Sequence, residues 1–210
     1  FESVASPTVG LESLMTTLMI GAYEGRKTIS FDIPGAFLQA EMSEEKLVLL
    51  KMKGRFVDMM CDINSEHRKN VTYEVGKNGK AYKVLYMKVI RAIYGCIEAA
   101  LQWYKLFTET LQDLGFKLNS YDKCIANKFE NGKQCTIAWH VDDCIATHVE
   151  QAVLDNLGKK MIKHFGEMEI NAGNKHDFLG MNIMINDDRT VSVEMQDQKE
   201  KAINWFEEES

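Results

Sequence analysis

The segment Val141-Asp142-Asp143 places two adjacent carboxylates between two short apolar segments, Ile137–Trp139 and Cys144–Ala146. Both apolar segments are typical of β-strands, so the two acids are expected at the tip of a hairpin. Just upstream, Asn131-Gly132 is the strongest short-range signal for a further hairpin turn. Carboxylates buried without partners are unfavourable, and the usual remedy is a cation. Paired acids on a rigid hairpin therefore predict an oxygen-rich site for Mg²⁺.

A third acid, Asp32, ends another strand-like segment, Thr28–Phe31. If this strand pairs with the hairpin, Asp32 and Asp142 converge on one metal-binding edge. Neighbouring strand residues point to opposite faces, so Asp142 and Asp143 are not equivalent. We therefore expect Asp32 and Asp142 to be the primary metal ligands, with Asp143 assisting. Two divalent ions at such an edge could activate a 3′-hydroxyl and neutralise charge at a phosphorus centre.

The composition is that of an ordinary globular chain. With 210 residues, 45% of them hydrophobic, the sequence can form one core or two small subdomains. An apolar run of about 18 residues, the length that a membrane helix needs, does not occur. Five cysteines without a CxxC pair indicate reduced thiols in an intracellular protein, and the N-terminus lacks a signal-peptide pattern. We expect no membrane partner.

The charge is unevenly distributed. A net charge of −6 is unusual for a protein that binds nucleic acid. Residues 77–105, however, carry six cations, Lys88 and Arg91 among them, against Glu98 alone. A solvated charged face is one interpretation of this segment. Contact with a template–primer is the other, and the motifs described next favour it.

Four short motifs resemble those of copia-type LTR-retrotransposon reverse transcriptases. Phe31–Leu38 resembles their first catalytic motif, and Phe178-Leu179-Gly180 resembles their primer grip. Ile93-Tyr94-Gly95, followed by Gln102-Trp103-Tyr104, resembles the motif that positions template and nucleotide. His140-Val141-Asp142-Asp143 stands where these enzymes carry Tyr-Val-Asp-Asp. Each motif alone is weak, but the four occur in the family's order and spacing over nearly the whole chain.

The resemblance implies an RNA-directed DNA polymerase that uses two Mg²⁺ or Mn²⁺ ions. The implied metal ligands are Asp32, Asp142, Asp143 and the backbone carbonyl of Ile33. The implied nucleotide-binding residues are Phe37, Tyr94, Gly95 and Glu98. Phe37 would exclude a ribose 2′-hydroxyl, although a core phenylalanine is the other interpretation. The implied primer or template contacts are His140, Val141, Trp103, Phe178, Leu179, Gly180, Lys88 and Arg91.

The implied partners are dNTPs, an RNA or DNA template–primer, and the RNase H and integrase regions of the same polyprotein. The implied location is the cytoplasm, virus-like particles or the nucleus. Some positions depart from the family: Glu98 replaces an amide, and Ile97 and Leu101 replace two cations. The basic segment that precedes the first helix in the family is also expected to be absent. The alternative is therefore an inactive retroelement remnant that binds nucleic acid or protein. A different two-metal nucleotidyl transferase or cyclase is a third hypothesis.

The expected fold is α+β, with a reverse-transcriptase palm in which helices pack on one face of an antiparallel sheet. We expect the palm in residues 1–45 and 92–175, partial fingers in 46–91, and the primer grip with the start of the thumb or connection in 176–210. Helices are expected after Ser6-Pro7, from Ala99, over 150–165 and over 196–210, and a short turn or helix is expected over 36–42. Strands are expected over 46–52 and 178–185, and a loop over 58–70.

Overall fold

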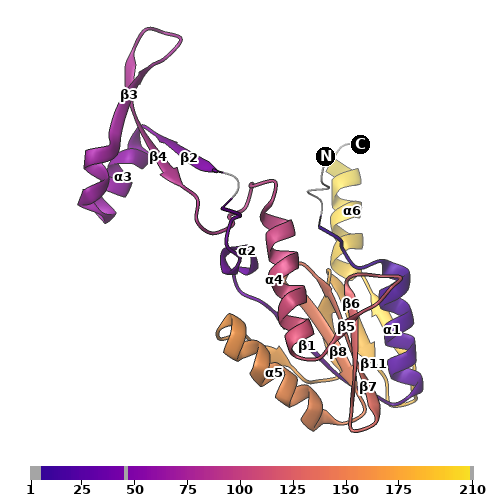
Figure 1. Cartoon of the computed structure of the whole chain (residues 1–210). Helices are drawn as coiled ribbons and strands as arrows, with labels where there is room; N and C mark the ends of the chain where they lie inside the picture. Colours follow the sequence, from indigo (N-terminus) through magenta and orange to yellow (C-terminus); the bar gives the residue numbers. More distant parts are fainter. Residues whose placement is uncertain (1–5, 45–46, 209–210) are drawn as a thin grey trace.

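The computed structural model describes residues 6–44 and 47–208, and its elements are arranged as in Figure 1. The chain is a mixture of helices and antiparallel sheets, as expected. Several expectations lie outside the described residues. They are the palm–fingers boundary at residues 45 and 46, the first residue of the strand expected at Lys46, and the last two residues of the C-terminal helix.

The largest sheet has six antiparallel strands in the order β5-β6-β7-β8-β1-β9. Their bounds are β1 Lys27–Asp32, β5 Lys117–Leu118, β6 Ile125–Glu130, β7 Lys133–His140, β8 Asp143–His148 and β9 Ile170–Asn171. The two predicted hairpins are confirmed, since β6 pairs with β7 and β7 pairs with β8. Asn131 and Gly132 join β6 to β7 with φ angles of 51° and 72°, the conformation that an Asn-Gly turn favours.

Helices cover both faces of this sheet, so the expectation of helices on one face was wrong. The aromatic side chains of α4 (Ala99–Asp113) pack on Trp139, and α5 (Gln151–Phe165) lies on the same side. On α1 (Leu11–Tyr23), Gly21 instead lies beside Thr147. Cys144 is the cross-strand partner of Trp139 and lies on the same face. Strand side chains alternate between faces, so Thr147, three residues after Cys144, lies on the opposite face. The face that carries Thr136 and Thr147 is therefore the one beside α1.

The first helix begins later than expected. Its N-cap is Gly10, whose N–H donates to the Asp122 carboxylate over 2.9 Å, so the prediction that Ser6 and Pro7 open the helix was wrong. Gly25 follows the helix with a φ of 65°, as a C-terminal glycine does.

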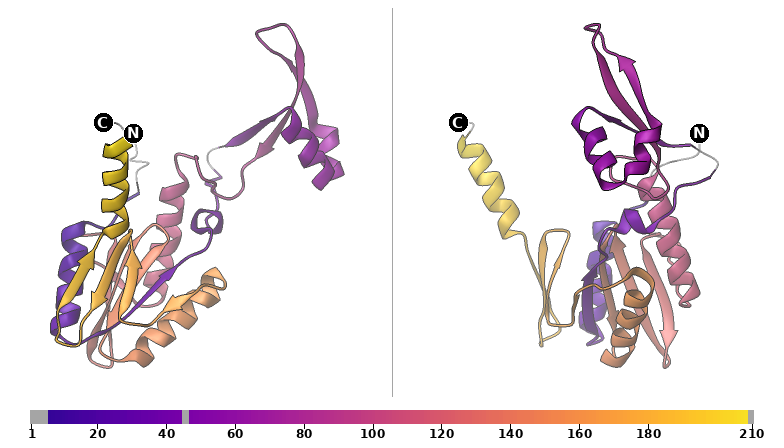
Figure 2. Two further views of the ribbon diagram at one scale, coloured as in Figure 1. Left: turned by 180° about the vertical axis from the view of Figure 1, so that it is seen from behind. Right: turned by 90° about the vertical axis from the view of Figure 1, so that its left-hand side faces the viewer.

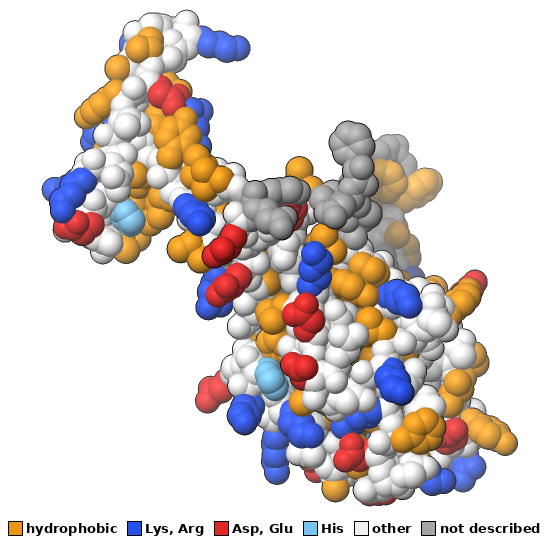
Figure 3. All heavy atoms as spheres, viewed as in Figure 1, with side chains coloured by type: hydrophobic (Ala, Val, Ile, Leu, Met, Phe, Trp, Pro, Cys, Tyr) orange, Lys and Arg blue, Asp and Glu red, His pale blue; other side chains and the backbone are white. Residues whose placement is uncertain are grey.

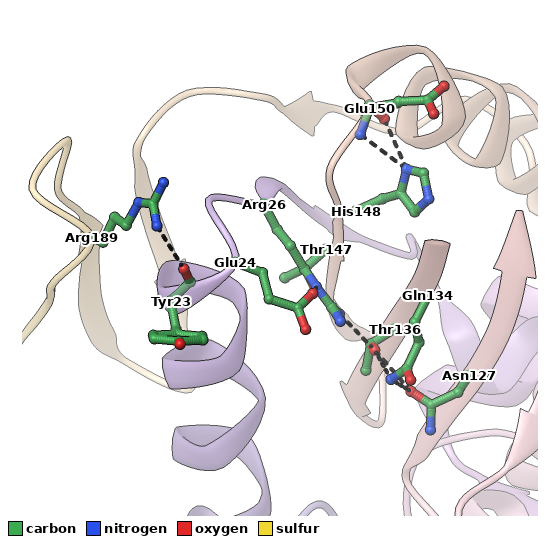
Figure 4. Close-up of polar contacts among 10 residues, drawn as sticks. All are labelled: Tyr23, Glu24, Arg26, Asn127, Gln134, Thr136, Thr147, His148, Glu150 and Arg189. Atoms are coloured by element: carbon green, nitrogen blue, oxygen red, sulfur yellow. Dashed lines mark hydrogen bonds and ion pairs between the residues drawn. The ribbon is translucent and has the colours of Figure 1, made fainter. Parts of the chain in front are cut away.

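A buried arginine fixes the start of β1. Arg26 is only 5% exposed, and its Nη1 donates to the Thr136 hydroxyl over 3.1 Å (Figure 4). Its Nε pairs with Glu24 over 2.8 Å, so the buried charge is compensated. Since β1 carries Asp32 at its far end, this network helps to set the register of the strand that leads to the predicted site.

A smaller unit projects from the main body (Figures 1 and 2). It consists of β2 (Leu49–Lys53), α3 (Arg55–Ile63), η1 (Ser65–Asn70), β3 (Val71–Val75) and β4 (Ala81–Lys88), with strand order β2-β4-β3. The strands β3 and β4 form an antiparallel hairpin. The predicted loop over 58–70 was wrong, because Val57 and Cys61, one helical turn apart, pack on Leu85 and make a helix favourable. Hydrophobic side chains remain on the surface of this unit beside Lys and Arg (Figure 3).

The C-terminal part forms a third sheet and a helix: β10 (Lys175–Phe178), β11 (Met181–Ile185), β12 (Val191–Glu194) and α6 (Gln196–Glu208). The prediction of one strand over 178–185 was wrong. Leu179 and Gly180 form a tight turn between β10 and β11, with φ angles of 56° and 70°. This sheet lies on the α1 side of the six-stranded sheet (Figure 2). In the described part of the chain, no helix is long and apolar enough to cross a bilayer.

Candidate active site

The two adjacent acids lie at the β7–β8 turn. His140 pairs with Asp143, so Val141 and Asp142 are the two residues of the loop. Val141 has a φ of 57°, a conformation that costs a β-branched residue about 1–3 kcal/mol. Trp103 on α4 donates its indole N–H to the Val141 carbonyl over 2.7 Å. The strained turn is therefore held from one side by a helix of the core.

The third acid lies beside this turn. Asp32, the last residue of β1, pairs with Asp143 in the antiparallel ladder, so both side chains lie on the same face. The Ile33 N–H donates to the Asp142 carbonyl over 3.1 Å and extends the pairing by one residue. The fold thus brings Asp32, Asp142 and Asp143 together at one end of the sheet, although they are far apart in sequence.

These acids perturb one another electrostatically. Burial raises the pKa of Asp32, and the charge of Asp142 raises it further. Burial also raises the pKa of Asp143, and Asp142, Asp32 and Asp177 add to the shift, while a backbone hydrogen bond from Leu179 opposes it. Ionising Asp32 and Asp143 is therefore unfavourable in the absence of a compensating cation.

The donor chemistry suits a hard divalent cation, because the available ligands are carboxylate oxygens. Among the residues that the structure describes, no three His, Cys, Asp or Glu side chains converge closely enough to chelate one ion. This arrangement is compatible with Mg²⁺, which proteins often hold through one or two carboxylates together with substrate phosphates.

A cleft of about 320 Å³ adjoins the acids. It is lined by Asp32, Asp143, Asp177, Glu169, Asn171 and neighbouring residues. Sequence reasoning missed Asp177 and Glu169. The signal for Asp177 was its place directly before Phe178-Leu179-Gly180, whereas nothing in the local sequence marks Glu169.

The expected nucleotide-binding residues come partly together. Phe37 lies on α2 (Ala36–Gln39), and its ring centroid is 4.7 Å from that of Tyr94 in an edge contact. Tyr94 is 69% exposed, and Gly95 follows it with a φ of 92°. Glu98 is the N-cap residue of α4. The structure thus pairs Phe37 with Tyr94 beside the start of the helix that carries Trp103.

The two expected cations differ in their surroundings. Lys88 is exposed at the end of β4, opposite Leu49. Arg91 is exposed but donates its Nη1 to the carbonyl of Leu38 over 3.1 Å, and it forms an isolated bridge with Glu41. Arg91 therefore also supports the end of α2.

Some expected primer and template contacts are interior. Trp103 is 2% exposed and Phe178 is 1% exposed, so both can influence a bound strand only through the turns that they support. His140 and Leu179 are half-buried, and the buried Nδ1 of His140 has no partner among the described residues. Val141 is half-buried at the turn itself, and Gly180 completes the turn after β10.

Comparison with known proteins places these features in a family. The family profile described as reverse transcriptase (RNA-dependent DNA polymerase) matches residues 1–207. Over 185 residues the chain is 23% identical to the retrovirus-related Pol polyprotein from transposon TNT 1-94 of Nicotiana tabacum. That alignment covers 88% of this chain but only 12% of the polyprotein, so the chain spans a small part of this relative.

Solved telomerase structures are more distant. Apo telomerase from Candida tropicalis gives a TM-score of 0.48 at 12% identity, covering 90% of this chain and 37% of that one. Telomerase from Candida albicans, bound to a fragment of telomeric RNA, gives 0.43 at 8% identity, covering 92% of this chain and 35% of that one. The family match rests instead on the sequence profile, which spans almost the whole chain: the protein belongs to the copia-type reverse transcriptase family.

Proposed function

We propose that this chain is the RNA-directed DNA polymerase domain of a retrotransposon polyprotein. A primer 3′-hydroxyl attacks the α-phosphorus of a dNTP, a phosphodiester bond forms, and pyrophosphate leaves. The observation that supports this proposal best is the pairing of Asp32 with Asp143 beside the Asp142 turn. Asp32 and Asp143, whose ionisation is disfavoured by burial and by neighbouring carboxylates, line an open cleft and are suited to a cation-assisted reaction on phosphate.

Asp32, Asp142, Asp143 and the backbone carbonyl of Ile33 would hold two Mg²⁺ or Mn²⁺ ions. When bound, such ions lower the pKa of the attacking hydroxyl and neutralise charge on the phosphates. The protein itself supplies geometry. Trp103 fixes the Val141 carbonyl, and β1 fixes Asp32 opposite Asp143, so the ligands are oriented before substrate arrives.

The nucleotide would bind beside Phe37, Tyr94, Gly95 and Glu98, with the Phe37 ring under the sugar. The edge contact with Tyr94 supports this role because it restricts the position of the Phe37 ring. His140, Val141 and the turn at Leu179-Gly180 would position the primer end. Lys88 and Arg91 would contact the template–primer backbone. Trp103 and Phe178 would act from the interior, by holding the two turns.

On this proposal residues 1–45 and 92–175 correspond to the palm, 46–91 to part of the fingers, and 176–210 to the primer grip and the start of the thumb or connection. The projecting unit of β2, β3, β4 and α3 supports the assignment of the fingers, since it extends from the main body as a separate lobe (Figure 1). RNase H and integrase regions of the same polyprotein would be its partners, in the cytoplasm, virus-like particles or the nucleus.

Primer extension on poly(rA)/oligo(dT) with Mg²⁺ or Mn²⁺ tests the proposal. Wild type should extend the primer, and Asp142→Ala should abolish extension while the chain stays folded. Asp187→Ala is the matched control, because Asp187 belongs to a second Asp-Asp pair in an exposed turn and should leave extension intact. A folded wild type that extends no primer would favour the inactive remnant that binds nucleic acid or protein.

A further inference from the structure

A buried histidine links the turn at Phe178-Leu179-Gly180 to the strand that carries Asp32. The His176 side chain, on β10, is 0% exposed, and its Nδ1 lies 2.9 Å from the hydroxyl of Ser30. Ser30 lies on β1, two residues before Asp32. The hydrogen bond therefore joins the third sheet to the six-stranded sheet close to the acids.

A second side-chain hydrogen bond also joins the two sheets, since Asn171 on β9 donates to the Lys175 carbonyl on β10 over 2.6 Å. Among the described residues, β10 and β1 belong to different sheets and share no ladder of backbone hydrogen bonds. Apolar packing, such as that of the buried Phe178, holds the two sheets together but is not directional. A hydrogen bond requires a defined distance and angle, so the Ser30–His176 pair can fix how the sheets sit relative to each other.

Burying the His176 ring costs stability, because one of its nitrogen atoms lacks a hydrogen-bond partner among the described residues. The Nε2 of His176 is buried and has no partner within the described chain. A buried polar atom without a partner is unfavourable, and an apolar side chain of similar size would avoid that penalty. The stability of the core does not explain the histidine. Besides a contact with the Gly173 backbone, its directional contribution is the bond to Ser30.

The turn that this bond supports reaches the acids. Leu179 follows His176 by three residues and adopts a φ of 56°, which is unfavourable for a leucine. Its backbone forms a hydrogen bond with the Asp143 carboxylate. A shift of β10 relative to β1 would move this backbone group away from Asp143, and it would move the whole turn with it.

We propose that His176 is a positioning residue: through Ser30 it sets the distance between the Leu179-Gly180 turn and the carboxylates of Asp32 and Asp143. This role rests on the proposed polymerase function, in which the Ser30–His176 bond would align the primer end with the reacting phosphate. Loss of the bond would then lower the rate of extension more than the affinity for primer.

The test compares wild type with Ser30→Ala, His176→Phe, the double variant and His176→Asn. The Asn side chain can place an amide near the position of Nδ1 and should restore the bond to Ser30. The first readout, amide hydrogen exchange at Leu179, requires no activity. Ser30→Ala and His176→Phe should each accelerate this exchange about fivefold, the effect of losing one hydrogen bond. The double variant should show no further acceleration, and His176→Asn should remain close to wild type.

The second readout is single-turnover primer extension. The rate constant should fall about fivefold in Ser30→Ala and in His176→Phe, with primer–template Kd changed less than about twofold, because alignment and not binding is impaired. Urea unfolding should show that the double variant, which leaves neither the hydroxyl nor the ring nitrogen without a partner, is at least as stable as wild type. A merely structural histidine would instead lower stability together with the rate.

Additive effects in the double variant, unchanged Leu179 exchange, or an Asn variant as impaired as the Phe variant would overturn the proposal. If wild type extends no primer, the polymerase proposal fails, and the exchange measurement still decides whether His176 positions the turn.

Discussion

The indole N–H of Trp103 donates a 2.7 Å hydrogen bond to the carbonyl of Val141, a β-branched residue with a φ of 57°. Helix α4 thereby stabilises Val141, whose backbone conformation is sterically unfavourable. The strained residue and the residue that compensates for the strain are therefore 38 positions apart in the chain. The geometry of the acids therefore depends on the packing of α4 on the sheet.

Trp103→Phe should destabilise the fold by about 1–3 kcal/mol, because the Val141 carbonyl loses its donor and a small cavity opens. Primer extension per folded molecule should fall as well, since the turn relaxes. The control is Phe165→Leu, which removes an aromatic ring from the same cluster without removing a hydrogen bond. Urea unfolding and extension assays measure the two effects. Equal losses of activity in both variants would mean that packing alone, and not the hydrogen bond, supports the turn.

Asp142→Asn should stabilise the fold at pH 7 by a few tenths to about 1 kcal/mol, the range of a partly exposed charge interaction. Asp32 and Asp143 have raised pKa values in the folded state, partly because of Asp142. An acid with a raised folded pKa costs stability above that pKa, and the cost disappears as the pH falls through it. The advantage of the variant should therefore shrink as the pH is lowered from 7 towards 4.

Urea unfolding across this pH range measures the difference. Millimolar Mg²⁺ should raise the Tm of wild type and leave that of Asp142→Asn nearly unchanged, because a ligand stabilises only the state that binds it. Asp187→Asn, in an exposed turn, is the matched control and should respond to Mg²⁺ as wild type does. A variant less stable than wild type at pH 7 would contradict the repulsion between these acids.

The sequence was sufficient to predict the central hairpins, because their signals are local. Asn131-Gly132 marks one turn, and the Val141-Asp142-Asp143 acids between two apolar segments mark the other. These two turns are short-range features, so no knowledge of packing was needed. The strand pattern at Thr28–Phe31 was also local, but its pairing with the hairpin entered the sequence argument only as a condition, because Asp32 and Asp143 are far apart in the chain.

The remainder depended on tertiary contacts. Helix α3 forms over a polar segment because Val57 and Cys61 pack on Leu85. The turn between β10 and β11 places Leu179 at a positive φ, which no local sequence signal predicts. The Ser30–His176 bond joins residues 146 positions apart, and neither residue carries a local signal. Similarly, the interior position of Trp103 cannot be read from its motif, which in the family is associated with template and nucleotide.

Lys88→Ala should reduce the salt dependence of template–primer binding, with the slope of log K against log salt falling by about 1, as expected for the loss of one phosphate contact. Lys88 is exposed at the end of β4, where the projecting unit joins the main body. Fluorescence anisotropy at several salt concentrations measures the slope. Lys133→Ala, at the opposite end of β7 from the acids, is the control and should keep the wild-type slope. Equal slopes for all three proteins would remove Lys88 from the interface.

Phe37→Val should weaken the discrimination between dNTPs and rNTPs by about tenfold or more, which corresponds to roughly 1–3 kcal/mol for a pocket that loses its steric block. The reason is geometric: α2 and the edge contact with Tyr94 hold the Phe37 ring, and a shorter side chain would leave room for a 2′-hydroxyl. Incorporation of dTTP and UTP opposite poly(rA) gives the two kcat/KM values. Phe129→Val makes the same change at an exposed position on β6 and should preserve the wild-type ratio. If Phe37→Val also keeps that ratio, Phe37 is a packing residue, and selection against the 2′-hydroxyl must lie elsewhere.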